Sequence, residues 1–180
     1  MGPERFPFRR RRKGYEDQVL LAYGALVSRH RGCAVGVTPA AAKPLLSQQA
    51  IFTTGGGNRC LGAAGSPTEP DIVTFPCTGH PDQLWTMTNK GELVNQNNQC
   101  IGVEGAKVAR GTKLVGFRCD GTPNQRWLFN PGTVAGRGIF VNGANSGLCM
   151  TRVETEKLGH VMLSDCNGED PQQWATGASG

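Results

Sequence analysis

The chain has 180 residues, of which 38% are hydrophobic and 26 are glycine. This length fits one domain with or without a tail. Glycine is at about twice its usual share of roughly 7%, which indicates many turns, and the lack of a G-X-Y period excludes collagen. The lack of a long apolar run excludes a membrane span. Residues 1–48 hold nine of the 19 Lys and Arg but only three of the 14 Asp and Glu, so the rest of the chain is nearly neutral and we do not expect it to bind nucleic acid.

The N-terminal segment, residues 1–48, differs in composition from the rest. Arg9–Lys13 is an uninterrupted basic run and Val19–Val27 an apolar one. This order is typical of a signal peptide, and cleavage after Ala34 would also remove the unpaired Cys33, although charged residues between the apolar run and that site argue against it. The alternatives are a disordered basic arm that could bind polyanions, an organelle-targeting peptide or an imperfect gene start. We expect a disordered or cleaved segment, followed by one domain over 49–180.

Short runs of strand-forming residues follow in chain order. Turn signals such as Asn142-Gly143 and Asn167-Gly168 separate them, and no long amphipathic helix is apparent after residue 49. Many short strands with regular turns predict an all-β barrel or sandwich. The predicted strands are Ile51–Thr54, Arg59–Gly62, Ile72–Cys77, Leu84–Thr88, Glu92–Asn95, Lys113–Cys119, Gly138–Val141 and Val161–Cys166.

One motif occurs three times in this region. Each copy has a cysteine, then glycine two residues later, glutamine at the sixth position after the cysteine and tryptophan at the eighth. An upstream cysteine followed by an aliphatic residue or methionine completes each unit. Such a repeat predicts a fold with quasi-threefold symmetry. The copies are Cys77–Trp85, Cys119–Trp127 and Cys166–Trp174, and the upstream cysteines are Cys60, Cys100 and Cys149.

The threefold symmetry selects one pairing of the six cysteines: Cys60 with Cys77, Cys100 with Cys119, and Cys149 with Cys166. Free buried cysteines are the alternative. Zinc binding is disfavoured because the sequence has no C-x-x-C motif and its three histidines are scattered. Three disulfides require an oxidising compartment, so we expect an extracellular, secreted protein.

Three Q-x-W motifs, each behind a disulfide-forming cysteine, resemble the ricin-type (R-type) lectin domain over residues 49–180. The resemblance implies a β-trefoil of twelve short strands with a six-stranded barrel and a triangular cap. It also implies binding of terminal sugars, of the galactose or N-acetylgalactosamine class, in one shallow pocket per repeat, with glycans or glycoproteins as partners. We interpret the three tryptophans, Trp85, Trp127 and Trp174, as core residues, because a large ring at an equivalent place in every unit fills the centre.

A sugar site of this family has an aspartate two residues after the first cysteine, an aromatic platform two residues before the second, and an Asn-Gln pair that opens Q-x-W. All three aspartate positions depart from this pattern, and the third repeat also lacks the platform and the asparagine. We therefore interpret the third repeat as structural. The departing residues are Gly62, Gly102 and Thr151 at the aspartate positions, and Ser164 and Pro171 in the third repeat.

The second repeat is the better candidate site, with Phe117 as platform and Asn124 and Gln125 as polar partners. The first repeat offers a weaker set of Phe75, Asp82 and Gln83. Both phenylalanines could instead simply cover the barrel. A nearby acid, Glu104 or Asp71, could replace the missing aspartate, but we expect both in exposed turns.

No catalytic motif is present, neither G-x-S-x-G, H-E-x-x-H nor a phosphate-binding loop, and we expect no enzyme, no cofactor and no metal. The leading hypothesis is a lectin-like module without catalysis. The alternative is a degenerate trefoil that has lost sugar binding and serves as a structural or protein-interaction module.

Overall fold

The computed structural model of the protein describes residues 46–55, 57, 59–154 and 158–177. The chain divides into two units, Met1–Ala40 and Ala41–Gly180, and all described residues belong to the second. The predictions for the N-terminal segment, including the signal peptide and the removal of Cys33, fall outside the described residues.

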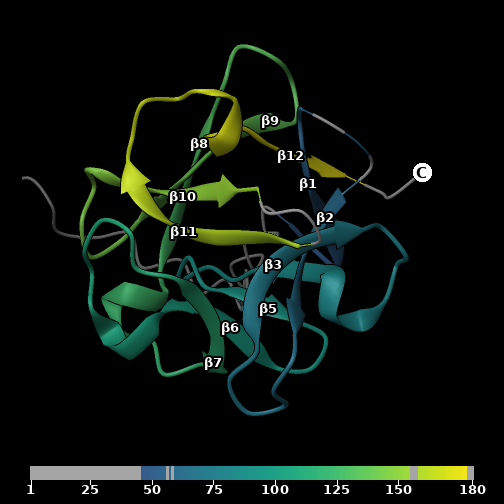
Figure 1. Ribbon diagram of the computed structural model, residues 1–180, viewed down its shortest axis with the longest axis vertical. Helices are drawn as coiled ribbons and strands as arrows, with labels where there is room; N and C mark the ends of the chain where they lie inside the picture. The colour runs from purple at the N-terminus through teal and green to yellow at the C-terminus, as the bar shows by residue number, and fades with distance from the viewer. Residues whose placement is uncertain (1–45, 56, 58, 155–157, 178–180) are drawn as a thin grey trace, which may run out of the picture. The chain divides into compact units, whose positions relative to one another are not determined.

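The described part of the chain forms twelve strands and four short 3₁₀ turns (Figure 1), and three repeats share them equally except for one extra turn. The first repeat contains β1 (Gln49–Thr53), β2 (Arg59–Ala64), β3 (Asp71–Pro76), η1 (Pro81–Gln83) and β4 (Leu84–Met87). The second contains β5 (Leu93–Asn95), β6 (Gln99–Val103), η2 (Glu104–Ala106), β7 (Leu114–Arg118), η3 (Pro123–Gln125) and β8 (Trp127–Pro131). The third contains β9 (Arg137–Asn142), β10 (Leu148–Val153), β11 (Gly159–Asp165), η4 (Asp170–Gln172) and β12 (Trp174–Gly177).

Six strands close into a barrel. β1 pairs with β4 and β12, β4 pairs with β5, and β9 pairs with β8 and β12, all antiparallel. The remaining seam, where β5 and β8 begin, is closed by the bridge between Glu92 and Arg126 and by the Trp127 N–H, which donates to the Gly91 carbonyl at 2.7 Å. Closure of this kind removes the exposed edges along which sheets aggregate.

Three hairpins, β2–β3, β6–β7 and β10–β11, form the triangular cap. Each touches the other two: Asp71 of β3 pairs with Val115 of β7, Val73 of β3 pairs with His160 of β11, and an isolated bridge joins β11 to the start of β7. With the barrel, this arrangement is the β-trefoil that the repeat and the family resemblance predict.

The three tryptophans lie in the core and are almost completely buried. Each indole Nε1–H donates to the carbonyl of the residue that follows the first cysteine of the same repeat: Trp85 to Leu61 at 2.9 Å, Trp127 to Ile101 at 3.0 Å and Trp174 to Met150 at 3.1 Å. A buried indole N–H without a partner would carry a desolvation penalty, so each ring is held in one orientation by this bond.

The three disulfides pair as the repeat symmetry predicts: Cys60–Cys77, Cys100–Cys119 and Cys149–Cys166. Each joins the first strand of one cap hairpin to the segment just after its second strand. By the chain-entropy estimate, a loop of 17 or 19 residues closed in this way contributes about 3 kcal/mol to stability.

The eight predicted strands are all present, with ends shifted by up to two residues, but four others were not predicted as strands: β6, β8, β10 and β12. They contain the cysteines or tryptophans of the repeat motif. Residues before the predicted domain start also belong to the fold, because Leu46 is buried in the core and its carbonyl accepts the Met87 N–H at 3.1 Å.

We therefore predict that Leu46→Ala lowers the free energy of unfolding by about 2–4 kcal/mol, because it leaves a cavity in the core. Chemical denaturation of the oxidised chain measures this. Leu128→Ala is the matched control: Leu128 is 66% exposed, and its loss should change stability by less than about 0.5 kcal/mol. Equal effects of the two substitutions would show that Leu46 does not belong to the core.

Candidate carbohydrate-binding site

The second repeat carries a hollow of about 680 Å³ near the end of β7. Two of its sides come from η2 and η3, and its wall includes the three residues predicted for this site, Phe117, Asn124 and Gln125. The structure therefore brings the predicted set of the second repeat together in one concave place.

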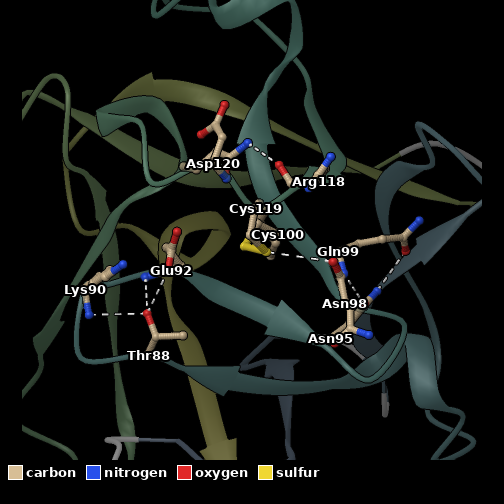
Figure 2. Close-up of a disulfide and its surroundings, with 12 residues drawn as sticks. Thr88, Lys90, Glu92, Asn95, Asn98, Gln99, Cys100, Arg118, Cys119 and Asp120 are labelled. Atoms are coloured by element: carbon tan, nitrogen blue, oxygen red, sulfur yellow. Dashed lines mark hydrogen bonds between the residues drawn. A yellow bond between two sulfur atoms is a disulfide. The ribbon is translucent and has the colours of Figure 1, made fainter.

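The local sequence holds the loop beside this hollow in shape. The Cys100–Cys119 disulfide fixes the end of β7, with Arg118 and Asp120 on either side of Cys119 (Figure 2). Pro123 then occupies the first position of η3, where its restricted backbone and missing N–H suit a helical start. The hollow is thus bordered by a cross-linked strand end and a stiff turn.

The glutamines of the Q-x-W motifs bind the backbone of their own repeat. Gln125 is only 3% exposed; its Oε1 accepts the Asp120 N–H at 3.0 Å and its Nε2 donates to the Arg118 carbonyl at 3.0 Å. Gln83 does the same in the first repeat, between the Thr78 N–H at 2.8 Å and the Pro76 carbonyl at 2.9 Å. Both amides are therefore engaged in holding the loop that follows the second cysteine.

The glycine at each vacant aspartate position lies against the phenylalanine of the same repeat. A Cβ atom added to Gly102 would lie 2.9 Å from Phe117 Cδ2, and one added to Gly62 would lie 2.7 Å from Phe75 Cε1. Such distances are shorter than real Cβ contacts. Each ring, which is half-buried, occupies the space into which the family's aspartate side chain would project. In both repeats the position of the ring therefore depends on the absence of a side chain at the glycine.

Asp120, which the sequence analysis did not single out, supplies a carboxylate to the wall of this hollow. The hydroxyl of Thr122 donates to its Oδ1 at 2.6 Å and the backbone N–H of Thr122 at 2.8 Å, and these two bonds lower the pKa of Asp120 below its usual value of 3.8. The signal that could have revealed it is Asp-Gly-Thr directly after the second cysteine, a pattern that forms an Asx turn.

Asn124 lies beside this turn in η3. Its Oδ1 is 3.1 Å from the Thr122 hydroxyl, and its backbone carbonyl accepts a bond from Asn142 Nδ2 at 3.3 Å. Asn124 is partly exposed, so its side chain borders the hollow while its backbone is fixed from the third repeat.

The residues predicted for the first repeat are arranged differently. Asp82 binds a neighbour on the protein surface, because its Oδ1 lies 2.8 Å from Nδ1 of His80. Phe75 lies half-buried over Gly62, as described above. The two acids considered as substitutes do not enter the wall of the second-repeat hollow: Glu104 is exposed at the start of η2, and Asp71 lies in β3.

In the third repeat, the side chains at and near the motif positions bind one another. The Thr151 hydroxyl, at the aspartate position, accepts a bond from Gln172 Nε2 at 3.1 Å. Asp170 accepts bonds from the buried Arg152 at 3.3 Å and from the Thr54 hydroxyl at 3.1 Å. These bonds connect η4 to β10 and to the loop after β1.

We predict that Gly102→Ala lowers the free energy of unfolding by about 1–3 kcal/mol, because the new methyl group displaces the Phe117 ring. In a Phe117→Ala background part of that cost should vanish, while the contact of the new methyl group with Gln125 Cγ at 3.0 Å remains. Urea denaturation of the four proteins of this double-mutant cycle measures the coupling. Gly132→Ala serves as the control, because its Cβ would meet its nearest neighbour at an ordinary 3.5 Å. Additive effects of Gly102→Ala and Phe117→Ala would contradict the contact.

The structure contains no grouping of three or more His, Cys, Asp or Glu able to hold a metal ion within the residues that it describes. Over the same residues, no helix is long and apolar enough to cross a membrane.

A trefoil with buried Q-x-W motifs and an aromatic-lined hollow beside a cap hairpin defines the class of β-trefoil lectin domains. The family model described as "Ricin-type beta-trefoil lectin domain" matches residues 48–174. The chain therefore belongs to the ricin-type β-trefoil lectin family and contains a carbohydrate-binding module.

Two relatives show how this module occurs elsewhere. Polypeptide N-acetylgalactosaminyltransferase 11 of Xenopus tropicalis is 25% identical over 137 residues, which are 73% of this chain and 22% of the transferase. Beta-galactoside-specific lectin 2 of Viscum album is 34% identical over 73 residues, 39% of this chain and 13% of the lectin. The chain thus spans less than a quarter of either relative.

Solved structures agree on the fold. The designed threefold-symmetric protein ThreeFoil superposes with a TM-score of 0.64 at 20% identity, covering 71% of this chain and 96% of its own. The C-terminal half of an earthworm R-type lectin, solved in complex with GalNAc, gives a TM-score of 0.54 at 15% identity, covering 71% and 95%.

Proposed function

We propose that this protein binds terminal sugars of the galactose or N-acetylgalactosamine class through the hollow of its second repeat, without catalysis. The observation that carries the proposal is that Phe117 and Asn124 line one hollow in a ricin-type lectin domain. The half-buried Phe117 ring offers an apolar surface for the C–H face of a sugar, and the Asn124 amide offers hydrogen bonds to its hydroxyls. Gln125 contributes indirectly, by holding the loop that carries Asp120.

Asp120 is the residue that we infer to replace the missing aspartate. Its Oδ1 is bound to Thr122, and because these bonds favour the ionised form, the carboxylate is charged and oriented before a ligand arrives. Hydrogen bonds from hydroxyls to a charged group contribute about 1.5–3 kcal/mol, more than those between neutral groups. A carboxylate at the rim of the hollow would thus restore the acceptor that Gly102 cannot supply.

The first repeat is proposed as a second, weaker site, since Asp82 is already paired with His80. The third repeat is proposed to be structural. Glycans or glycoproteins outside the cell are the partners that we propose, because three disulfides suit an oxidising compartment. The names of two relatives, a beta-galactoside-specific lectin and a GalNAc-bound lectin, support the sugar class.

A glycan array with the full-length, oxidised chain tests the function. We expect selective binding to terminal galactose or N-acetylgalactosamine, lost in Phe117→Ala because the stacking surface disappears. Phe75→Ala is the matched control, the equivalent change in the first repeat, and it should keep most of the binding. If the folded, fully disulfide-bonded chain binds no glycan, the trefoil is a scaffold, and its partners are to be sought among proteins.

The pH dependence of binding tests the role of Asp120. Because the pKa of Asp120 is lowered, its carboxylate stays ionised to a lower pH than an ordinary aspartate does. The binding of a single sugar that depends on this carboxylate should therefore be constant near neutral pH and fall as the pH drops through the lowered pKa. Titration of the ligand by calorimetry at several pH values, with Asp120→Asn beside the natural chain, measures this. Equal affinities of the two proteins at neutral pH would exclude Asp120 as the acceptor.

A further inference from the structure

The hollow of the second repeat is bordered by a segment of the first. Glu69, in the loop between β2 and β3, is part of its wall. It comes from the first repeat, whereas Phe117 and Asn124 come from the second. The motif positions of the family lie within one repeat, so nothing in the repeat pattern points to Glu69. The residue reaches the hollow because the cap hairpins of the two repeats lie side by side, where Asp71 pairs with Val115.

Two bonds from the second repeat hold this loop in place. Gln99 Nε2 donates to the Pro67 carbonyl at 3.0 Å, and the Gly116 N–H donates to the Pro70 carbonyl at 2.8 Å. Gly116 also packs directly on the proline, since a Cβ added there would lie 2.8 Å from Pro70 Cγ. The loop is therefore attached to β6 and β7, the strands that carry the hollow.

The loop is also ordered from within. The Ser66 hydroxyl accepts the N–H groups of Thr68 at 3.3 Å and Glu69 at 3.4 Å. Pro67 and Pro70 restrict the backbone on both sides of these residues. The backbone of Glu69 is thus held in position before any ligand binds, which lowers the entropy that binding must overcome.

The Glu69 side chain is exposed, and within the described part of the chain it takes part in no ion pair. A carboxylate accepts hydrogen bonds from sugar hydroxyls and has no proton to donate. The hollow of about 680 Å³ falls in the range of roughly 300–1,000 Å³ found for sites of drug-sized ligands, which are larger than one hexose. The hollow thus has room for a ligand larger than one sugar ring, and Glu69 adds a second carboxylate to its wall beside Asp120.

We propose that the site is composite: Phe117, Asn124 and Asp120 hold the terminal sugar, and Glu69 of the first repeat accepts hydroxyls of the next sugar in the chain. The natural ligand is then an oligosaccharide rather than a single sugar. This inference rests on the proposed function and adds to it the length of the ligand. Glu69 is a specificity-determining residue, because it distinguishes a terminal sugar alone from the same sugar linked to another.

Calorimetric titration of the full-length, oxidised chain with galactose and with lactose tests the proposal. Both ligands have the same terminal sugar, and only lactose has a second ring. We expect tighter binding of lactose, and in Glu69→Gln we expect a loss of about tenfold in lactose affinity with galactose affinity unchanged. Glu104→Gln is the matched control, because it removes the same charge from an exposed residue of η2 outside the wall of the hollow.

Three results would overturn the inference. Lactose affinity that Glu69→Gln leaves unchanged would exclude the contact while the lectin function stands. An equal loss in Glu104→Gln would assign the effect to overall charge rather than to a contact. Failure of the natural chain to bind either sugar, together with an empty glycan array, would remove the proposed function and this inference with it.

A second variant tests whether the position of the loop that carries Glu69, and not only the charge of Glu69, affects binding. Gln99→Ala removes the bond to the Pro67 carbonyl, and with it the bond that Asn95 Nδ2 donates to Gln99 Oε1, without changing Glu69. The loop is loosened but stays attached through the bond between Gly116 and Pro70. Lactose affinity should fall several-fold, less than in Glu69→Gln, while galactose affinity stays constant. Lactose affinity equal to that of the natural chain would show that the attachment of the loop to the second repeat has no part in binding.

Discussion

The whole architecture depends on a buried hydrogen bond that occurs three times, from a tryptophan Nε1–H to the carbonyl next to the first cysteine of the same repeat. It connects a barrel strand to the first strand of a cap hairpin, and the disulfide then connects that hairpin to the loop in which the glutamine amide binds. Ring, disulfide and amide thus fix the same few backbone groups from different sides. All three repeats have the same indole bond, disulfide and glutamine bonds, although their outer residues differ.

The shared bonds involve residues on the inner side of each loop, whereas the residues on the outer side differ among the three repeats. The frame is held by these residues that face inward. In the second repeat the outer residues border a hollow; in the first, an acid pairs with a histidine; in the third, Asp170 links Arg152 to Thr54 and so joins the last repeat to the first. One frame therefore carries three different sets of contacts among the residues on its outer side.

The fold could be predicted from the sequence because its determinants are periodic. Tryptophan, glutamine and paired cysteines recur at equivalent places, and the structure confirms the trefoil and the disulfide pairing that they indicate. Motif residues alone do not explain the missed strands, because β2 with Cys60 and β4 with Trp85 were predicted. In the missed β10, five consecutive residues are buried, so the alternation typical of a half-buried strand is absent. Two residues of the candidate site could not be predicted from the sequence motif. Glu69 reaches the hollow only through contact between repeats, and Asp120 acquires its lowered pKa from Thr122, neither of which a motif within one repeat encodes.

The contact between glycine and phenylalanine in the first two repeats also couples two positions that the motif treats as separate. A Cβ atom added at Gly62 or Gly102 meets the ring of the same repeat, so that ring has to shift before any larger residue fits. For protein engineering, the acceptor and platform positions of one repeat therefore have to be varied together. A carboxylate meets less obstruction at the exposed rim of the hollow, where Asp120 already lies, than at position 102.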